Sequence, residues 1–276
     1  MLPNFIVIGA RKSGTTSLWN YLRAHPQVFM PDEKEIHFFL AENFAKGVDH
    51  YRSLFPKPEG ALAVGEASTT YSRYPMYPGV AERMARVVPD ARLVYLVRHP
   101  TERLRSHYLQ EVYRGRETRS IDRAVLEDPQ YVDASRYAFQ LDQYMGHFGR
   151  EQVLVVTTDE LRAQRGATVR RVVAFVGADP DRVDDERLHE EHYKSQDKLI
   201  ERPLARAAKR IPHGRLSALA PRWIRSTYRS AAYARFRPPP TTLAPDVVRV
   251  LEDRLRADAA RLRDYLGPGF DGWGLL

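Results

Sequence analysis

A glycine-containing loop, Gly9 to Thr16, is the strongest chemical signal in the 276-residue sequence. The loop directly follows the apolar run Phe5 to Ile8 and opens a segment with helical spacing. Two glycines let such a backbone curl so that its N–H groups converge on an anion, and the N-terminus of the following helix adds partial positive charge. The sequence therefore predicts a phosphate cradle at this loop.

The position of the lysine in the loop separates two chemistries. The triphosphate signature G-x-x-x-x-G-K-[ST] places a lysine directly after its second glycine, where this chain has Thr15. Lys12 lies three residues earlier, inside the loop, which suits the leaving-group end of a shorter phosphate chain. No apolar run ends in an aspartate suited to magnesium, so triphosphatase chemistry is disfavoured.

A second anion site is predicted where the apolar run Leu93 to Val97 ends in Arg98. Pro100 favours an extended residue before it and a helix after it, so Arg98 is expected at the carboxyl edge of a strand, where α/β sheets bind ligands. Ser106 follows two turns into that helix, so an arginine and a hydroxyl can clamp one phosphate together. One cradle and one remote clamp indicate a nucleotide phosphorylated at two places.

Two further side chains, Glu35 and His37, could move a proton. Side chains alternate along an extended segment, so both are predicted to lie on one side of it. The residues around them are predicted to be structural: a solvated charge pair, Glu33 and Lys34, and two core side chains, Phe38 and Phe39.

The elements that must position these groups alternate in kind. Apolar runs predict strands at 5–8, 63–64, 93–97 and 153–156, and helical spacing predicts helices at 16–24, 80–88, 101–113, 137–148 and 168–176. Continuous apolar strands separated by helices indicate a parallel sheet covered on both faces. The predicted fold class is therefore α/β, a P-loop-like three-layer sandwich with a central, mostly parallel sheet.

Residues 179–276 differ from this core. The stretch Lys198 to Arg237 holds eleven Lys or Arg and one acid, a charge of +10, whereas the chain as a whole carries +8. A last helix is predicted from Pro245 to Leu266. We expect a single domain over residues 1–276, in which a helical and irregular segment, 179–276, wraps a nucleotide-binding core, 1–178. The basic stretch is expected to cap the acceptor cleft, which is the part of the site that a second substrate would enter, and to attract an anionic acceptor or membrane headgroups.

Composition excludes several classes of protein. Apolar residues at 43% and charged residues at 28% lie near globular averages, which excludes disordered and fibrous chains. No apolar run exceeds seven residues, and the first residues lack the pattern of a secretory signal. Without cysteine there is no disulfide framework, thiolate nucleophile or Cys-based zinc site. We expect a cytoplasmic protein, and the sequence predicts no particular oligomeric state.

The chain contains four stretches in a characteristic order: FIVIGARKSGTTSLWNYLRAHPQV, KEIHFF, GEASTTY and LVYLVRHPTERLRSHYLQEVY. Together they resemble the sulfotransferases that use 3′-phosphoadenosine 5′-phosphosulfate (PAPS), and above all the carbohydrate branch typified by heparan sulfate glucosaminyl sulfotransferases. The similarity is dense over Phe5 to Tyr113. A soluble bacterial member of this family is expected.

The resemblance implies a role for each predicted site residue. The 5′-phosphosulfate would be held by the loop residues, which are Lys12, Ser13, Gly14, Thr15, Thr16 and the adjacent Ser17. Arg98 and Ser106 would hold the 3′-phosphate. Glu35 would act as base on the acceptor, Lys12 would neutralise charge on the leaving nucleotide, and no metal would be required. His37 would either serve as an alternative base or acceptor contact, or orient Glu35.

Two departures from the family pattern concern the acceptor rather than the nucleotide. Ala67 stands where heparan sulfate enzymes commonly have a lysine, and Leu40 stands where an acid often follows the paired phenylalanines. The predicted acceptor is therefore a hydroxyl or amine of a carbohydrate, or of a glycosylated or small metabolite.

Two rival classes stay open. A P-loop small-molecule kinase is disfavoured because Thr15 replaces the lysine. A basic nucleic-acid-binding protein would use aromatic side chains in the basic stretch, namely Trp223, Tyr228, Tyr233 and Phe236. No recognition motif accompanies them, so no specific nucleic-acid partner is expected.

Overall fold

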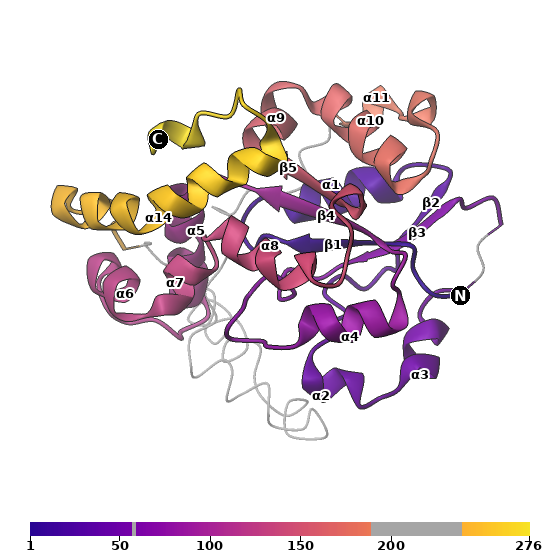
Figure 1. Cartoon of the computed structure of the whole chain (residues 1–276), viewed down its shortest axis with the longest axis horizontal. Coiled ribbons are helices and arrows are strands. Elements are labelled where there is room, and N and C mark those ends of the chain that lie inside the picture. Colours follow the sequence, from indigo (N-terminus) through magenta and orange to yellow (C-terminus); the bar gives the residue numbers. More distant parts are fainter. Residues whose placement is uncertain (57–58, 189–238) are drawn as a thin grey trace, which may run out of the picture.

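The computed structural model describes residues 1–56, 59–188 and 239–276 of the chain. At its centre lies a five-stranded parallel sheet with the order β2-β3-β1-β4-β5 (Figure 1). The strands are β1 (Phe5–Gly9), β2 (Val28–Phe29), β3 (Ala63–Ala67), β4 (Arg92–Val97) and β5 (Val153–Thr157). The predicted α/β class and parallel sheet are confirmed. The edge strand β2 was missed because two residues carry no periodicity.

Helices of very different lengths surround the sheet in the described part of the chain. They are α1 (Thr15–Arg23), α2 (Ala41–Phe44), α3 (Val48–Ser53), α4 (Val80–Val87), α5 (Pro100–Tyr113), α6 (Ile121–Glu127), α7 (Pro129–Asp133), α8 (Tyr137–Met145), α9 (Thr158–Ala163), α10 (Arg165–Val176), α11 (Asp185–Leu188) and α14 (Pro245–Leu266). The last helix has the predicted bounds. No helix among the described residues is long and apolar enough to cross a bilayer.

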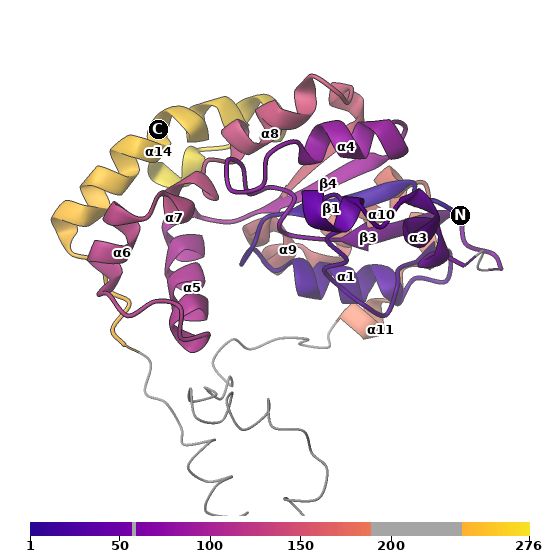
Figure 2. The ribbon, with the colours of Figure 1, turned by 90° about the horizontal axis from the view of Figure 1, so that it is seen from below.

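The two faces of the sheet are buried by different helices, as Figures 1 and 2 show. Phe5 and Val7 of β1 pack in one apolar cluster with α1 and α10. Ile6 and Ile8, the alternate residues, pack in a second cluster with α4 and α8. Both faces of every inner strand are therefore covered, and the three-layer sandwich is confirmed.

The helix α14 joins the core from the far end of the sequence. Its residues Leu251 and Leu255 pack in a third apolar cluster with α5, α6 and α7, and its Leu262 reaches the cluster under α8. Asp258 accepts hydrogen bonds from the N–H groups of Ala138 (3.0 Å) and Phe139 (2.8 Å), which start α8. These contacts tie α14 to the α/β core (Figure 2).

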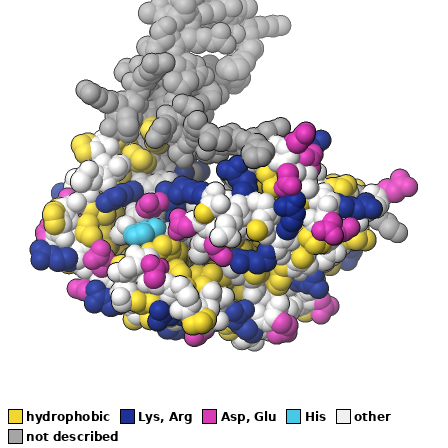
Figure 3. All heavy atoms as spheres, turned by 90° about the horizontal axis from the view of Figure 1, so that it is seen from above, with side chains coloured by type: hydrophobic (Ala, Val, Ile, Leu, Met, Phe, Trp, Pro, Cys, Tyr) yellow, Lys and Arg dark blue, Asp and Glu magenta, His cyan; other side chains and the backbone are white. Residues whose placement is uncertain are grey.

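The basic stretch 198–237 lies outside the described residues, so its expected place over the acceptor cleft stays a prediction, as does the division of the chain at residue 178. On the face of the body in Figure 3, basic, acidic and apolar side chains are interspersed. This mixture agrees with the near balance of charge that the sequence predicts outside that stretch.

The strand β3 is longer than predicted because a buried acidic residue continues it. Glu66 is 1% exposed and accepts hydrogen bonds from the hydroxyls of Tyr51 (2.6 Å), Ser68 (2.7 Å) and Tyr71 (3.0 Å). These donors offset the cost of burying a polar group, so the strand does not end where the apolar run ends, at Val64. Burial raises the pKa of Glu66 from its usual 4.5 to about 7, although the three hydrogen bonds oppose this shift.

We predict that Glu66→Gln alters the pH dependence of stability. Between about pH 4.5 and pH 7 the folded chain keeps a proton on Glu66 that the unfolded chain releases. The contribution of Glu66 to the free energy of unfolding is therefore highest below this interval. It falls as the pH rises through the interval, by up to about 1.4 kcal/mol per pH unit. Urea titrations from pH 4.5 to pH 8 should show a shallower decline for Glu66→Gln than for the wild type. The control is Glu82→Gln on α4, whose side chain is 61% exposed; equal slopes for all three proteins would contradict the assignment.

Candidate active site

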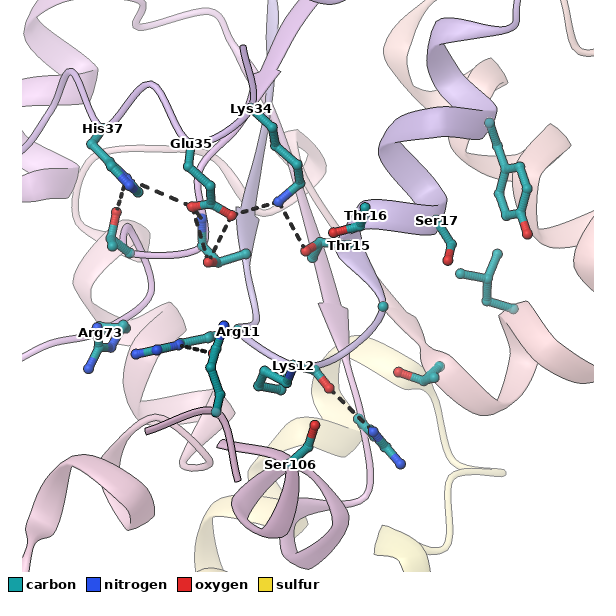
Figure 4. A pocket seen from close by; sticks show the side chains of 18 of the residues that line it. Arg11, Lys12, Thr15, Thr16, Ser17, Lys34, Glu35, His37, Arg73 and Ser106 are labelled. Carbon is teal, nitrogen blue, oxygen red and sulfur yellow. Dashed lines mark hydrogen bonds and ion pairs between the residues drawn. The ribbon is translucent and has the colours of Figure 1, made fainter. Parts of the chain in front are cut away.

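A cavity of about 750 Å³ opens at the carboxyl edge of the sheet. Nine of the ten predicted site residues line it: Lys12, Gly14, Thr15, Thr16, Ser17, Glu35, His37, Arg98 and Ser106. They come from the loop after β1, the segment after β2, the end of β4 and the helix α5 (Figure 4). The fold thus gathers groups that lie up to 94 residues apart in the sequence.

The loop after β1 has the backbone that its glycines predict. A Cβ on Gly9 would collide with Ser72 Oγ, so the loop can lie against its neighbour only with glycine there. Gly14, at φ 92°, is left-handed and starts α1. The first N–H groups of a helix have no intrahelical acceptor, and Thr15 and Thr16 line the cavity. These groups and the side chain of Lys12 can bind one anion.

Ser13 is the one predicted residue that does not line the cavity. Its side chain is fully buried, and its N–H donates to the carbonyl of Ala10 (3.2 Å). Thr158 Oγ1, at the start of α9, lies 2.7 Å from the carbonyl oxygen of Ser13 and 2.9 Å from that of Val97. Ser13 thus anchors the loop to the sheet edge, and its predicted contact with the nucleotide has no support from this geometry.

Arg98 lies at the end of β4, as predicted, and its guanidinium contacts both α5 and the loop after β1. Nε and Nη2 donate to Glu102 Oε2 (2.9 and 2.6 Å), and Nη1 lies 3.4 Å from the carbonyl oxygen of Lys12. Burial opposes ionisation of Glu102, but the hydrogen bond and the charge of Arg98 hold its pKa below the usual value. Ser106 of α5 lines the same cavity. The arginine and the hydroxyl thus line one cavity, and their joint role as a phosphate clamp stays a prediction.

The carboxylate of Glu35 is held by three groups. Lys34 Nζ donates to Oε1 (2.6 Å), while the N–H of Thr69 donates to Oε2 (2.8 Å) and its hydroxyl lies 3.1 Å from Oε1. Lys34 Nζ also lies 3.5 Å from Thr15 Oγ1, so it links Glu35 to the loop (Figure 4). The prediction that Lys34 is a solvated charge was wrong, because its side chain is 15% exposed and belongs to the site.

His37 shares the cavity with Glu35, but not by regular alternation. Both residues have left-handed backbone, at φ 57° and 68°, so the segment is not an extended strand. Four non-glycine residues among those described have positive φ, and three of them, Lys12, Glu35 and His37, line the cavity. Strained backbone of this kind is concentrated at functional sites.

The imidazole of His37 contacts two groups. Nδ1 lies 2.8 Å from Thr70 Oγ1 and 3.8 Å from Glu35 Oε2. Burial lowers the pKa of His37 below its usual 6.5; the charge of Glu35 opposes this shift and that of Lys34 adds to it. A neutral ring beside the carboxylate suits both predicted roles, which stay predictions.

Several cavity residues were not predicted as site residues by the sequence analysis: Arg11, Lys34, Thr69, Thr70, Arg73, Tyr77, Arg114, Arg116, Arg162 and Arg165. For the two threonines a signal existed, because they follow β3 and parallel strands end at one sheet edge. No comparable signal marks the arginines. Among the described residues, no group of three or more His, Cys, Asp or Glu side chains could hold a metal ion.

The fold and this site define a P-loop-like α/β protein with a cationic cavity at the edge of its sheet, and comparison with known proteins gives its family. Residues 2–210 match the model of the family described as the sulfotransferase domain. The chain therefore belongs to the sulfotransferase domain family. A sulfotransferase from Alicyclobacillus acidocaldarius has a similar structure, with 27% sequence identity, a TM-score of 0.71 and coverage of 99% of both chains.

The curated relatives of this chain are much longer proteins. The bifunctional heparan sulfate N-deacetylase/N-sulfotransferase 1 of Caenorhabditis briggsae is 30% identical over 188 residues, which cover 59% of this chain and 21% of that protein. The membrane-associated sulfotransferase kil1 of Dictyostelium discoideum is 41% identical over 113 residues, or 39% of this chain and 22% of that protein. The chain thus spans about a fifth of the length of these curated relatives. A mouse sulfotransferase complexed with PAP shares the fold, at 14% identity and a TM-score of 0.51 over 99% of this chain and 87% of the mouse chain.

We predict that Arg98→Ala weakens binding of adenosine 3′,5′-bisphosphate by about tenfold to a hundredfold, the value of one charge-assisted hydrogen-bonded contact. Adenosine 5′-monophosphate, which lacks the 3′-phosphate, should lose little affinity. Isothermal titration calorimetry measures both. The matched control is Arg92→Ala at the opposite end of β4, where the guanidinium donates to the carbonyl of Phe175. Equal losses for the two nucleotides would argue against the clamp.

Proposed function

We propose that the chain transfers the sulfuryl group of PAPS to a hydroxyl or amine of a carbohydrate, or of a glycosylated or small-metabolite acceptor, with Glu35 as the base. The observation that carries this proposal is that Glu35 faces the anion-binding loop across one cavity (Figure 4). The names of the relatives, heparan sulfate sulfotransferases among them, support a carbohydrate acceptor.

The cavity fits a nucleotide phosphorylated at two places. The loop with Lys12 can hold the 5′ end, and Arg98 with Ser106 can hold the 3′-phosphate. PAP in a mouse protein of the same fold supports PAPS as the sulfuryl donor. Lys12 would then offset the negative charge that grows on the bridging oxygen as adenosine 3′,5′-bisphosphate leaves.

The contacts of Glu35 suit a base. As the acceptor attacks, its proton must leave, and a carboxylate directed into the cavity can accept it. Lys34 and Thr69 fix the orientation of the carboxylate, so that one oxygen can face the acceptor. In-line transfer requires the acceptor to approach from the side opposite the leaving nucleotide, which is the side of Glu35 and His37 in Figure 4.

We predict that Glu35→Gln lowers turnover at least about a hundredfold while leaving the affinity for adenosine 3′,5′-bisphosphate nearly unchanged. The amide keeps the size and the hydrogen bond from Thr69 but cannot accept a proton. The assay is transfer of labelled sulfate from PAPS to a panel of amino sugars, sugars and glycosides, followed by calorimetry with the nucleotide. Glu33→Gln, at the exposed neighbouring acid, is the control. Unchanged turnover would place the base elsewhere, and His37→Gln is then the next variant, since His37 is the rival base.

We also predict that sulfate transfer survives an excess of chelator. Lys12, Arg98 and the helix N-terminus supply the positive charge that a kinase obtains from magnesium. Turnover with and without EDTA should agree within error. Loss of transfer on chelation, or tighter binding of magnesium–ATP than of adenosine 3′,5′-bisphosphate, would favour the small-molecule kinase instead.

A further inference from the structure

The cavity extends beyond Glu35 into a region lined by arginines. We call Arg11, Arg73, Arg114 and Arg116 the arginine cluster; all four line the cavity. Arg11 and Arg73 lie on the same side of the loop as Glu35 and His37, away from Ser17 (Figure 4). They are therefore on the acceptor side of the proposed reaction.

A single buried carboxylate holds most of the arginine cluster together. Glu111 of α5 is 6% exposed, forms an ion pair with Arg11, and lies 3.6 Å from Arg114 Nη1 and 4.0 Å from Arg116 Nη1. Arg11 Nε also donates to Gln110 Oε1 (2.9 Å). Arg11 is only 10% exposed, whereas Arg114 and Arg116 are 45% and 67% exposed, so the cluster extends from the buried part of the cavity to side chains in contact with solvent.

Arg73 adds a fourth positive charge without an acidic partner. It is 7% exposed, donates to Gln130 Oε1 (3.1 Å) and lies 5.5 Å from the centre of the Tyr77 ring. It forms no ion pair with any acidic residue that the structure describes. Burial and the charge of Arg73 lower the pKa of Arg11 to about 10, even though Glu111 opposes the shift. Buried cations that repel one another in this way favour the entry of an anion.

The nucleotide does not account for this surplus. Its proposed contacts are the loop, Arg98 and Ser106, and Arg162 and Arg165 line the same cavity from α9 and α10. The described side chains of the arginine cluster and Glu111 together carry four positive charges and one negative charge, and solvent partly screens the exposed Arg114 and Arg116.

Building on the proposed function, we propose that the arginine cluster is a second oxyanion subsite, which binds a carboxylate, sulfate or phosphate group already present on the acceptor. An acceptor held there by its charge presents its hydroxyl or amine to Glu35. A bidentate contact from the planar guanidinium of Arg73 would fix its orientation. The acceptor is therefore an anionic molecule, and its neutral counterpart is a poor substrate.

Inorganic sulfate is the first probe. The full chain is saturated with adenosine 3′,5′-bisphosphate, which fills the nucleotide sites, and sulfate is titrated by calorimetry at low salt. We expect one sulfate to bind, with affinity reduced about tenfold in Arg73→Gln and more in the double variant with Arg114→Gln. Arg73→Lys keeps the charge and should restore part of the affinity. Arg86→Gln on α4, whose side chain is 61% exposed, should bind like the wild type.

Competition then identifies the oxyanion. Glucuronate, glucose 6-sulfate and glucose 6-phosphate are compared with glucose for displacement of sulfate from the loaded chain. At least one charged sugar should displace sulfate at about a tenth of the concentration at which glucose does, and the best competitor names the group.

Four outcomes are distinguishable. Sulfate bound equally well by the wild type and a folded Arg73→Gln variant overturns the subsite, and so does the absence of sulfate binding to the nucleotide-loaded chain. Equal competition by charged and neutral sugars overturns it as well. Failure of the chain to bind adenosine 3′,5′-bisphosphate at all overturns the proposed function itself, which the first three outcomes leave intact.

Discussion

Parallel pairing of the inner strands is the constraint on which the site depends. Because β1, β3, β4 and β5 run in one direction, their carboxyl ends lie at one edge of the sheet, and every loop that follows them opens onto the same cavity. The close packing of the loop after β1 against its neighbours adds to this constraint. With no side chain at Gly9, the loop can lie against Ser72, and Thr158 ties the loop to the end of β4. The anion-binding N–H groups thus have a fixed position relative to the other strand ends.

The charge of the cavity lining suits the binding of anions. Lysine and arginine are the most frequent side chains of the lining, and Glu35 is the one acidic residue among the described residues that line the cavity. A second carboxyl group, that of Glu66 in β3, is buried beneath the cavity lining. Burial raises its pKa to about 7, so it carries a proton below about pH 7. The hydroxyl of Ser68 connects this buried carboxyl group to the cavity lining, since it donates to Glu66 and accepts from the N–H of His37. The positions of the proposed base and its neighbour therefore rest on a buried network of hydrogen bonds.

The proposed chemistry follows from the family, whereas the proposed acceptor depends on side chains particular to this cavity. Residues 2–210, which include the loop after β1, Glu35 and Arg98, match the family model, and curated relatives are about 30% identical to this chain. The acceptor side departs from them at Ala67 and Leu40, both of which are buried here and cannot contact a substrate. Arginines from the first loop, from the segment after β3 and from the end of α5 occupy that side instead. Three of these arginines, Arg73, Arg114 and Arg116, lie outside the four stretches that resemble the family, so the proposed selectivity for the acceptor depends mainly on charge outside the family motifs.

The sequence alone determined what depends on near neighbours. The loop from Gly9 to Thr16, the position of Arg98 at the end of β4 and the bounds of α14 all follow from consecutive residues or from helical spacing, which act over a few positions. The tertiary structure decided which distant groups meet. Arg11 and Glu111 lie 100 residues apart and form an ion pair, while Lys34 reaches Thr15 and left-handed backbone brings Glu35 and His37 into one cavity. Such contacts depend on the pairing order of the strands and on the direction of each loop, and no local pattern encodes either.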